Sequence, residues 1–235
     1  MTNESSPIGF ELAGSTPKLL IVDAPKYIVV EGAIGVGKTS LTRKLADTLG
    51  YEMVLERPNE NPFLERFYRA PKHNALPTQL YFIFQRIKQL QELKQDDMFS
   101  RGRVADFLLE KDYLFAQVTL DDDEFRLYQQ VYSNLKIDVP TPDLVIYLQA
   151  SPDVLMSRVR KRGVKYEADI HPDYLRKLSD AYTAYFHRYV ESPLLIINAS
   201  EMNFVEREEH YQALVEQIAT TRSGRHFFNP LVEAL

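Results

Sequence analysis

One stretch of the chain decides the fold: Gly32-Ala33-Ile34-Gly35-Val36-Gly37-Lys38-Thr39, which matches the pattern G-x-x-x-x-G-K-[ST] in full. An apolar run leads into it and a helical pattern leads out of it, as this motif requires. Glycines let such a loop turn successive backbone N–H groups inward, where they bind phosphates together with the positive end of the helix. The stretch therefore predicts a phosphate-binding loop (P-loop) with ATP-binding residues 32–40, Ser40 included. Lys38 is expected to reach the terminal phosphates and Thr39 to ligate Mg²⁺.

Apolar runs alternate with helical patterns along the chain, as in a parallel sheet wound with crossover helices. The first and fourth runs are nearly continuous in Val, Ile and Leu, which is typical of strands covered on both faces. The sequence thus predicts an α/β fold, an open, doubly wound parallel sheet of five strands with the P-loop after the first. The expected strands are Tyr27–Glu31, Met53–Leu55, Val104–Phe107, Leu144–Leu148 and Leu194–Ile197.

Amphipathic patterns and helix caps place helices between these strands. Gly50 stands where a left-handed C-cap is expected. Ser151-Pro152-Asp153 supplies an N-cap, a proline at the first helical position and an acid, and His171-Pro172-Asp173 opens a further helix. Two apolar stripes are expected to face the core, one of Leu41, Leu45 and Leu49 and one of Leu80, Phe84, Ile87 and Leu90.

Composition and charge restrict the class of protein. The chain has 235 residues, of which 45% are hydrophobic and 26% charged, values typical of a globular protein with one α/β domain. The net charge of −5 argues against a nucleic-acid partner. No apolar run is long enough for a membrane span, no cysteine can form a disulfide, and the N-terminus lacks a signal-peptide pattern. We expect a cytoplasmic enzyme with a flexible tail, residues 1–24, and a single domain, residues 25–235.

A phosphate-binding loop is compatible with a kinase, an enzyme that transfers a phosphoryl group to an acceptor hydroxyl. A kinase also needs a group that takes the proton of this hydroxyl, commonly a carboxylate just beyond a strand end. Glu56 follows the second expected strand and opens Glu56-Arg57-Pro58-Asn59-Glu60-Asn61-Pro62-Phe63-Leu64. With the P-loop before it, this segment resembles the deoxynucleoside kinase family, and the resemblance extends over about residues 27–204. The resemblance implies transfer of the ATP γ-phosphoryl group to the 5′-hydroxyl of a deoxyribonucleoside, with Glu56 as the general base. An exposed loop glutamate is the alternative.

The same resemblance implies a nucleoside site. Gln79 and Arg86 are seven residues apart and therefore lie on one helix face, and a Gln amide suits the edge of a base because it both donates and accepts. Tyr68 and Glu167 match the residues that bind the sugar 3′-hydroxyl in the family. The alternatives are that Gln79 caps or solvates a helix start and that Tyr68 is an ordinary half-buried aromatic.

A dense basic cluster, Arg158, Arg160, Lys161 and Arg162, comes before Gly163. In P-loop kinases a basic lid folds over the triphosphate, and its guanidinium groups offset the charge of the transferring phosphoryl group. By resemblance, Arg158 and Arg162 are the lid arginines with a catalytic role. A favourable interaction with a helix C-terminus is the alternative.

The third strand departs from the family pattern. The family carries an acid-Arg-Ser motif there, whereas this chain has Asp106 followed by Phe107. Asp106 is predicted to hold Mg²⁺ with Thr39, and the cation that contacts the 5′-hydroxyl region is missing. The second family acid, which helps to recognise the base, is Asp112 in one register, and in the other its position falls on Lys111.

These observations predict an ATP- and Mg²⁺-dependent deoxynucleoside kinase of nucleotide salvage. The resemblance also implies a mild preference for purine deoxynucleosides and a homodimer, which is common in the family. Two rivals remain. A nucleoside monophosphate kinase resembling thymidylate kinase needs a cationic pocket, for which Arg57 or Arg69 is available, but Glu56 would repel a monophosphate. A catalytically silent nucleotide-binding subunit is favoured only by the missing arginine. The sequence does not rank the four bases.

Overall fold

The computed structural model describes residues 8–10, 19–21, 24–95, 101–135, 139–202, 204 and 207–229. The strands in these residues are β1 (Ile8–Phe10), β2 (Leu19–Ile21), β3 (Tyr27–Glu31), β4 (Glu52–Val54), β5 (Arg103–Ala105), β6 (Leu144–Gln149), β7 (Leu194–Asn198) and β8 (Arg225–Phe228). The α-helices are α1 (Lys38–Leu49), α2 (Leu64–Arg69), α3 (Pro71–Gln95), α4 (Lys111–Thr119), α5 (Asp122–Asn134), α6 (Pro152–Arg162), α7 (Pro172–Arg188) and α8 (Glu208–Thr220). Two 3₁₀ helices, η1 (Pro58–Glu60) and η2 (Lys165–Asp169), complete the set.

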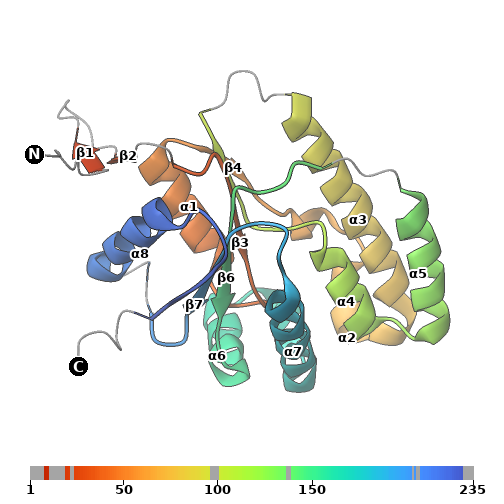
Figure 1. Cartoon of the computed structure of the whole chain (residues 1–235). Coiled ribbons are helices and arrows are strands. Elements are labelled where there is room, and N and C mark those ends of the chain that lie inside the picture. The colour runs from red at the N-terminus through yellow and green to blue at the C-terminus, as the bar shows by residue number, and fades with distance from the viewer. Residues whose placement is uncertain are drawn as a thin grey trace, which may run out of the picture.

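The main sheet is parallel and has the order β4-β5-β3-β6-β7-β8. The central strand β3 pairs with β5 through Ile28 and Val104 and with β6 through Ile28 and Leu144. In Figure 1, α1 and α8 lie on one side of this sheet and α3, α4 and α5 on the other. The predicted doubly wound α/β architecture is confirmed. Because the strands are parallel, the carboxyl ends of β4, β5 and β3 meet at one edge, where the P-loop begins.

Burial follows the apolar runs that the sequence shows. In β3, the residues from Ile28 to Val30 are fully buried, and so are those from Leu144 to Ile146 in β6. Such continuous burial requires cover on both faces of the sheet, which the helices supply. The core therefore lies along β3 and β6 and fixes the strand ends that carry the candidate site.

Three of the predicted helix ends are confirmed. Gly50 ends α1 with a φ of 66°, Ser151 accepts a hydrogen bond from the Val154 N–H at 3.4 Å at the start of α6, and His171 caps α7.

One residue that was predicted to lie in the core is exposed. Phe84 on α3 is 52% exposed, because α3 packs on its neighbours through a face that leaves this position on the surface.

The sheet has one strand more than the five expected. The additional strand, β8, is a short edge strand in which Phe227 is 75% exposed, so it lacks the apolar run that marked the others. The third strand also ends earlier than predicted, at Ala105. Beyond its end, the Leu108 N–H donates to Glu31 at 2.7 Å, so the chain here bonds to a side chain of the neighbouring strand.

The segment predicted to be a tail contains a short antiparallel pair, β1 with β2. Apart from these two strands and Ala24, the residues of the predicted tail lie outside the described part of the chain. The prediction of a flexible tail followed by a single domain stays a prediction.

Candidate active site

The P-loop connects β3 to α1 and presents its backbone. Gly35 and Gly37 have φ angles of 85° and 108°, in the left-handed region that favours glycine. The Lys38 ammonium donates to the carbonyls of Gly32, at 2.8 Å, and Ala33, at 3.2 Å. The half-buried Lys38 is therefore held against the loop as a fixed positive charge.

Gly35 also brings the P-loop against α6. A Cβ atom at this position would lie 2.8 Å from the Leu155 carbonyl oxygen and 2.9 Å from the Val159 side chain. Only glycine allows so close an approach. The start of α6, which leads into the basic cluster, is thus packed directly on the phosphate-binding loop.

A cavity of about 550 Å³ opens over the P-loop between α1 and α6. Arg158 donates to the carbonyls of Val36, at 3.1 Å, and Ala199, at 2.7 Å, and so connects the P-loop to the loop after β7. Of the predicted ATP-binding residues, 35–40 line this cavity. We call it the donor cavity; Gly35, Val36, Gly37, Lys38, Thr39, Ser40, Leu41, Leu148, Arg158, Lys161, Arg162, Ala199, Met202 and Phe204 line it.

Asp106 joins the P-loop to the segment that contains Glu56. Its Oδ2 accepts a hydrogen bond from the Thr39 hydroxyl at 2.6 Å, and its Oδ1 accepts one from the Glu56 N–H at 2.7 Å. The two predicted metal ligands are therefore neighbours. Hard oxygen donors of this kind suit Mg²⁺, which binds through one or two carboxylates together with substrate phosphates.

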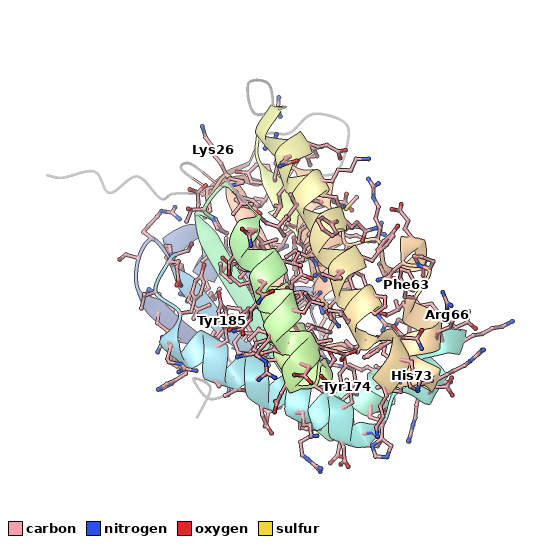
Figure 2. All side chains as sticks on the ribbon, turned by 90° about the vertical axis from the view of Figure 1, so that its right-hand side faces the viewer. Lys26, Phe63, Arg66, His73, Tyr174 and Tyr185 are labelled. Carbon is pink, nitrogen blue, oxygen red and sulfur yellow. The ribbon has the colours of Figure 1, made fainter. Side chains whose placement is uncertain are left out.

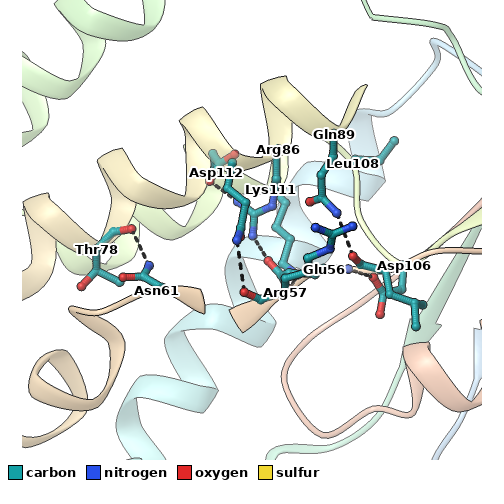
Figure 3. A network of polar contacts seen from close by, with 12 residues as sticks. Glu56, Arg57, Asn61, Thr78, Arg86, Gln89, Asp106, Leu108, Lys111 and Asp112 are labelled. Carbon is teal, nitrogen blue, oxygen red and sulfur yellow. Dashed lines mark hydrogen bonds and ion pairs between the residues drawn. The ribbon is translucent and has the colours of Figure 1, made fainter. Parts of the chain in front are cut away.

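The Glu56 carboxylate belongs to a buried ionic network (Figure 3). Arg86 of α3 donates to Glu56 Oε1 and also to Asp112. Lys111 donates to Glu56 Oε2 at 2.8 Å. Of the two residues left open by the register, Asp112 is the acid beside Arg86, and Lys111 is directed toward Glu56. Which of them helps to recognise the base stays a prediction. The alternative that Glu56 is an exposed loop residue is wrong, since its side chain is only 17% exposed.

The charges of this network act on its protonation equilibria. Burial by itself raises the pKa of Glu56, but Arg86 and Lys111 outweigh burial and hold this pKa well below its ordinary value. Burial raises the pKa of Asp112 to about 7, against the opposing charge of Arg86. Burial and the charge of Lys111 lower the pKa of Lys38 to about 8. Glu56 is therefore an anion near neutral pH, whereas Asp112 changes its charge there.

A second cavity, of about 250 Å³, lies beside this network, and we call it the acceptor cavity. Gln79, Arg86 and Tyr68 line it. Among the described residues, Gln79 Oε1, Arg86 Nε and Asp112 Oδ2 are buried without a hydrogen-bond partner. Buried polar atoms without partners are costly, so those of Gln79 and Arg86, which line the cavity, are suited to a polar ligand. Asp112 is fully buried behind Arg86 and does not line the cavity. The alternative that Gln79 caps or solvates a helix start is wrong, because it is 1% exposed within α3.

The segment after α6 closes the far wall of the acceptor cavity. Arg162 donates to the Glu167 carboxylate at 2.6 Å, and both residues line the cavity. The rings of Tyr68 and Tyr166 stack with their centroids 6.1 Å apart, and the Tyr166 hydroxyl donates to Asn59 at 2.8 Å. The predicted sugar-binding pair, Tyr68 and Glu167, thus faces one cavity, although Glu167 is paired with Arg162.

The donor and acceptor cavities share a wall made of Gly35, Lys38, Thr39 and Arg162. A group bound to the P-loop through phosphates therefore lies next to a ligand of the acceptor cavity, with Glu56 on the acceptor side. Fold and site together define a P-loop phosphotransferase for a small acceptor.

Sequence reasoning missed two cations of the acceptor cavity. Lys111 appeared only as a register alternative for an acid, and the exposed Arg43 of α1 was not considered. The available signal for Lys111 was its place beside Asp112 at a helix start, just after the strand that lacks its arginine.

Comparisons with known proteins identify the family. The deoxynucleoside kinase family matches residues 28–222. The deoxyguanosine kinase of Bacillus subtilis is 29% identical over 198 residues, which cover 82% of this chain and 95% of that protein. The deoxyadenosine kinase of Dictyostelium discoideum is 31% identical over 213 residues, which cover 87% of this chain and 82% of that protein. A solved structure of deoxyadenosine kinase from M. mycoides with bound dATP has a TM-score of 0.73 at 26% identity and covers 82% of this chain and 99% of that one.

The chain belongs to the deoxynucleoside kinase family and is an ATP-dependent kinase of deoxynucleosides. Within the described ranges, no helix has the length and apolar character needed to cross a bilayer. Those same ranges contain no group of three His, Cys, Asp or Glu residues placed to hold a metal ion.

Proposed function

We propose that the site residues act as the sequence predicted: the P-loop binds the ATP phosphates, and Glu56 takes the proton of the 5′-hydroxyl. The observation that carries this proposal is the wall shared by the two cavities, which includes Lys38 and Arg162. An acceptor oxygen beside Glu56 and a γ-phosphate on Lys38 meet at this wall. Positioning and charge stabilisation then supply the catalysis, without a covalent intermediate.

The lid arginines differ in their proposed contributions. Arg162 lines both cavities and is 47% exposed, so it is available to contact the transferring group once Glu167 releases it. Arg158 holds the P-loop backbone through Val36 and faces the donor cavity. We assign Arg162 to the charge of the transition state and Arg158 to the triphosphate.

Mg²⁺ is the proposed cofactor, held by Thr39 and Asp106. Their side chains are within hydrogen-bond distance of each other beside the P-loop, and both offer the oxygen atoms that Mg²⁺ prefers. When bound, the ion supplies positive charge to the phosphates of ATP. Asp106 also fixes the backbone of Glu56, so one side chain orients both reactants.

The proposed acceptor is a deoxynucleoside, with purines preferred. Gln79 and Arg86, which line the acceptor cavity, and the fully buried Asp112 beside Arg86 are assigned to the base. Tyr68 with Glu167 is assigned to the sugar 3′-hydroxyl. The relatives at about 30% identity are deoxyguanosine and deoxyadenosine kinases, which supports the purine preference.

Two features speak against a monophosphate acceptor. Arg57 and Arg69, the two cations that the sequence suggested for its phosphate, do not line the acceptor cavity and pair with Glu60 and Glu65 instead. The Glu56 anion would also repel a monophosphate placed beside it. We therefore favour the nucleoside over the nucleotide.

The test is ATP- and Mg²⁺-dependent phosphorylation of the four deoxynucleosides, with their monophosphates in parallel. We expect turnover of purine deoxynucleosides and a loss of about 10²–10³-fold in kcat in Glu56→Gln, because general-base catalysis contributes about this much. Glu65→Gln, on an exposed helix face, is the matched control. Turnover of monophosphates alone would replace this proposal with the nucleotide-kinase alternative, and near-normal turnover in Glu56→Gln would remove Glu56 as the base.

We further propose a homodimer that uses the face formed by α3 and α5, which Figure 2 shows side by side. This face exposes two large apolar side chains, Phe84 at 52% and Leu127 at 49%. Light scattering would test it: Phe84→Glu with Leu127→Glu is expected to give monomers, and a monomeric wild type would contradict the proposal. The cytoplasmic location stays a prediction that cell fractionation would check.

A further inference from the structure

Lys111 is a buried cation that the mechanism above does not use. It is the first residue of α4, and its side chain is 4% exposed. Its Nζ donates to Glu56 Oε2 at 2.8 Å, while Arg86 donates to the other carboxylate oxygen. Figure 3 shows both cations directed toward Glu56. One cation would be enough to hold the Glu56 carboxylate in place. The second cation is therefore a candidate for another role in the site.

The strand end before α4 supplies no cation of its own. Phe107 follows Asp106 and is fully buried, with its ring 5.9 Å from the Arg86 guanidinium. Its side chain belongs to the core and cannot stabilise a charge in the cavity. Lys111, four residues further along the chain, lines the acceptor cavity together with Lys38.

The position of Lys111 relative to the reacting atoms follows from Glu56. A hydroxyl that gives its proton to Glu56 must bond to the carboxylate at about 2.7 Å. Two groups bonded to one carboxylate oxygen are at most about 5.5 Å apart, since each lies within hydrogen-bond distance of that oxygen. The Lys111 ammonium has three N–H donors, and Glu56 accepts one of them. The others are available to an oxygen on the acceptor.

We propose that Lys111 is a catalytic residue of the acceptor side, whose ammonium contacts the 5′-oxygen and the phosphoryl group transferred to it. The proposal rests on the proposed function and deepens it. In the step, the 5′-oxygen forms a bond to the γ-phosphorus and its proton goes to Glu56. The bond from the γ-phosphorus to the bridging oxygen of ATP breaks, and its electron pair leaves with ADP. The Lys111 ammonium stabilises the charge that gathers on the acceptor.

A binding experiment separates this role from a structural one, because only the product has a phosphoryl group on the 5′-oxygen. Calorimetry would measure the affinities for deoxyadenosine and its 5′-monophosphate, and for the guanine pair. In Lys111→Met we expect monophosphate affinity to fall about tenfold or more and nucleoside affinity to change less than about threefold. Lys111→Arg should keep most of the monophosphate affinity. Lys88→Met, an exposed lysine of α3, is the matched control and should bind as the wild type does.

Equal weakening of both ligands in Lys111→Met would overturn the proposal, since it would make Lys111 only a support for Glu56. Unchanged affinities, or a wild type that binds neither ligand, would overturn it as well. If Lys111→Met does not fold, the same ratio is measured on Lys111→Gln. Turnover is the second readout: kcat should fall about 10²-fold in the neutral variants, with the KM for the nucleoside within about threefold. A wild type that binds both ligands without turnover would end the proposed function while leaving the binding ratio to decide the role of Lys111.

Discussion

The donor and acceptor cavities meet at one wall, but they are built differently. Half of the residues that line the donor cavity are consecutive, 35–41, and belong to the P-loop and the start of α1. The acceptor cavity collects side chains from α1, α2, α3, α4 and the segment after α6, and its charges are balanced in a buried network around Glu56. A site of backbone groups depends on the local conformation of one loop. A site of buried charges depends on every partner being present, because removing one leaves another unpaired.

The largest effect is expected at the fixed charge of the donor side. Lys38→Ala should lower kcat/KM about 10³-fold or more, since it removes a preorganised charge at the transferring group. The affinity for the deoxynucleoside should stay within about threefold, because the Lys38 ammonium is held by the loop carbonyls of Gly32 and Ala33. Steady-state kinetics and calorimetry would check both values. Lys44→Ala is the control, a lysine of the same helix that pairs with Glu208. A loss of kcat/KM below tenfold in Lys38→Ala would show that the P-loop backbone stabilises the transferring group without the lysine.

The connection between the two sides is tested at Asp106. Asp106→Asn should reduce kcat about 10²-fold and raise the Mg²⁺ concentration needed for half-maximal rate, because the amide loses the charge that suits the ion. An asparagine oxygen can still accept from the Glu56 N–H, so the fold of the acceptor side should persist. Rates measured over a Mg²⁺ titration would check this. An unchanged Mg²⁺ dependence would contradict the role of Asp106 in holding the ion.

The acceptor side should respond to pH through its base preference. Asp112, with a pKa raised to about 7 by burial, is a protonated donor below this pH and only an acceptor above it. Deoxyadenosine presents an amino group and deoxyguanosine a carbonyl, so the ratio of their kcat/KM values should move toward deoxyadenosine between pH 6 and 8, by up to about tenfold. In Asp112→Asn the ratio should be flat. A flat ratio in the wild type would mean that Asp112 does not contact this edge of the base.

The smallest effect is expected at the sugar. Tyr68→Phe should lower kcat/KM about fivefold for a deoxynucleoside, which corresponds to one neutral hydrogen bond, and should leave a 3′-deoxy analogue unaffected. Competition assays with the two acceptors would measure the difference. Equal losses for both would show that the Tyr68 hydroxyl does not act through the sugar 3′-hydroxyl.

The sequence could predict what depends on local pattern. The P-loop, the central strands and the strand-end acids Glu56 and Asp106 are read from short runs with fixed spacing, and the structure places them together at one sheet edge. The network around Glu56 depends on long-range packing. Lys111 and Asp112 are adjacent in the chain, yet one contacts Glu56 and the other Arg86, a division that no spacing rule gives.

The missed elements have a similar cause. The edge strand β8 gains its backbone hydrogen bonds from β7, not from an apolar pattern of its own. Phe84 belongs to an apolar stripe at helical spacing, but which part of a helix faces solvent is decided by its neighbours, and here the stripe extends past the covered face.

The close packing of Gly35 on α6 has a consequence for motion. Because a single Cβ would not fit between the P-loop and Leu155, we expect these two segments to move together. We then expect any opening of the lid to hinge beyond α6, at Gly163, which has a φ of 69° and open surroundings. Arg162 lies next to this hinge and Arg158 one turn before it, so we expect opening to carry Glu167 away from the acceptor while Arg158 stays on the triphosphate. We expect such a hinge to let the monophosphate leave while ADP stays bound at the P-loop.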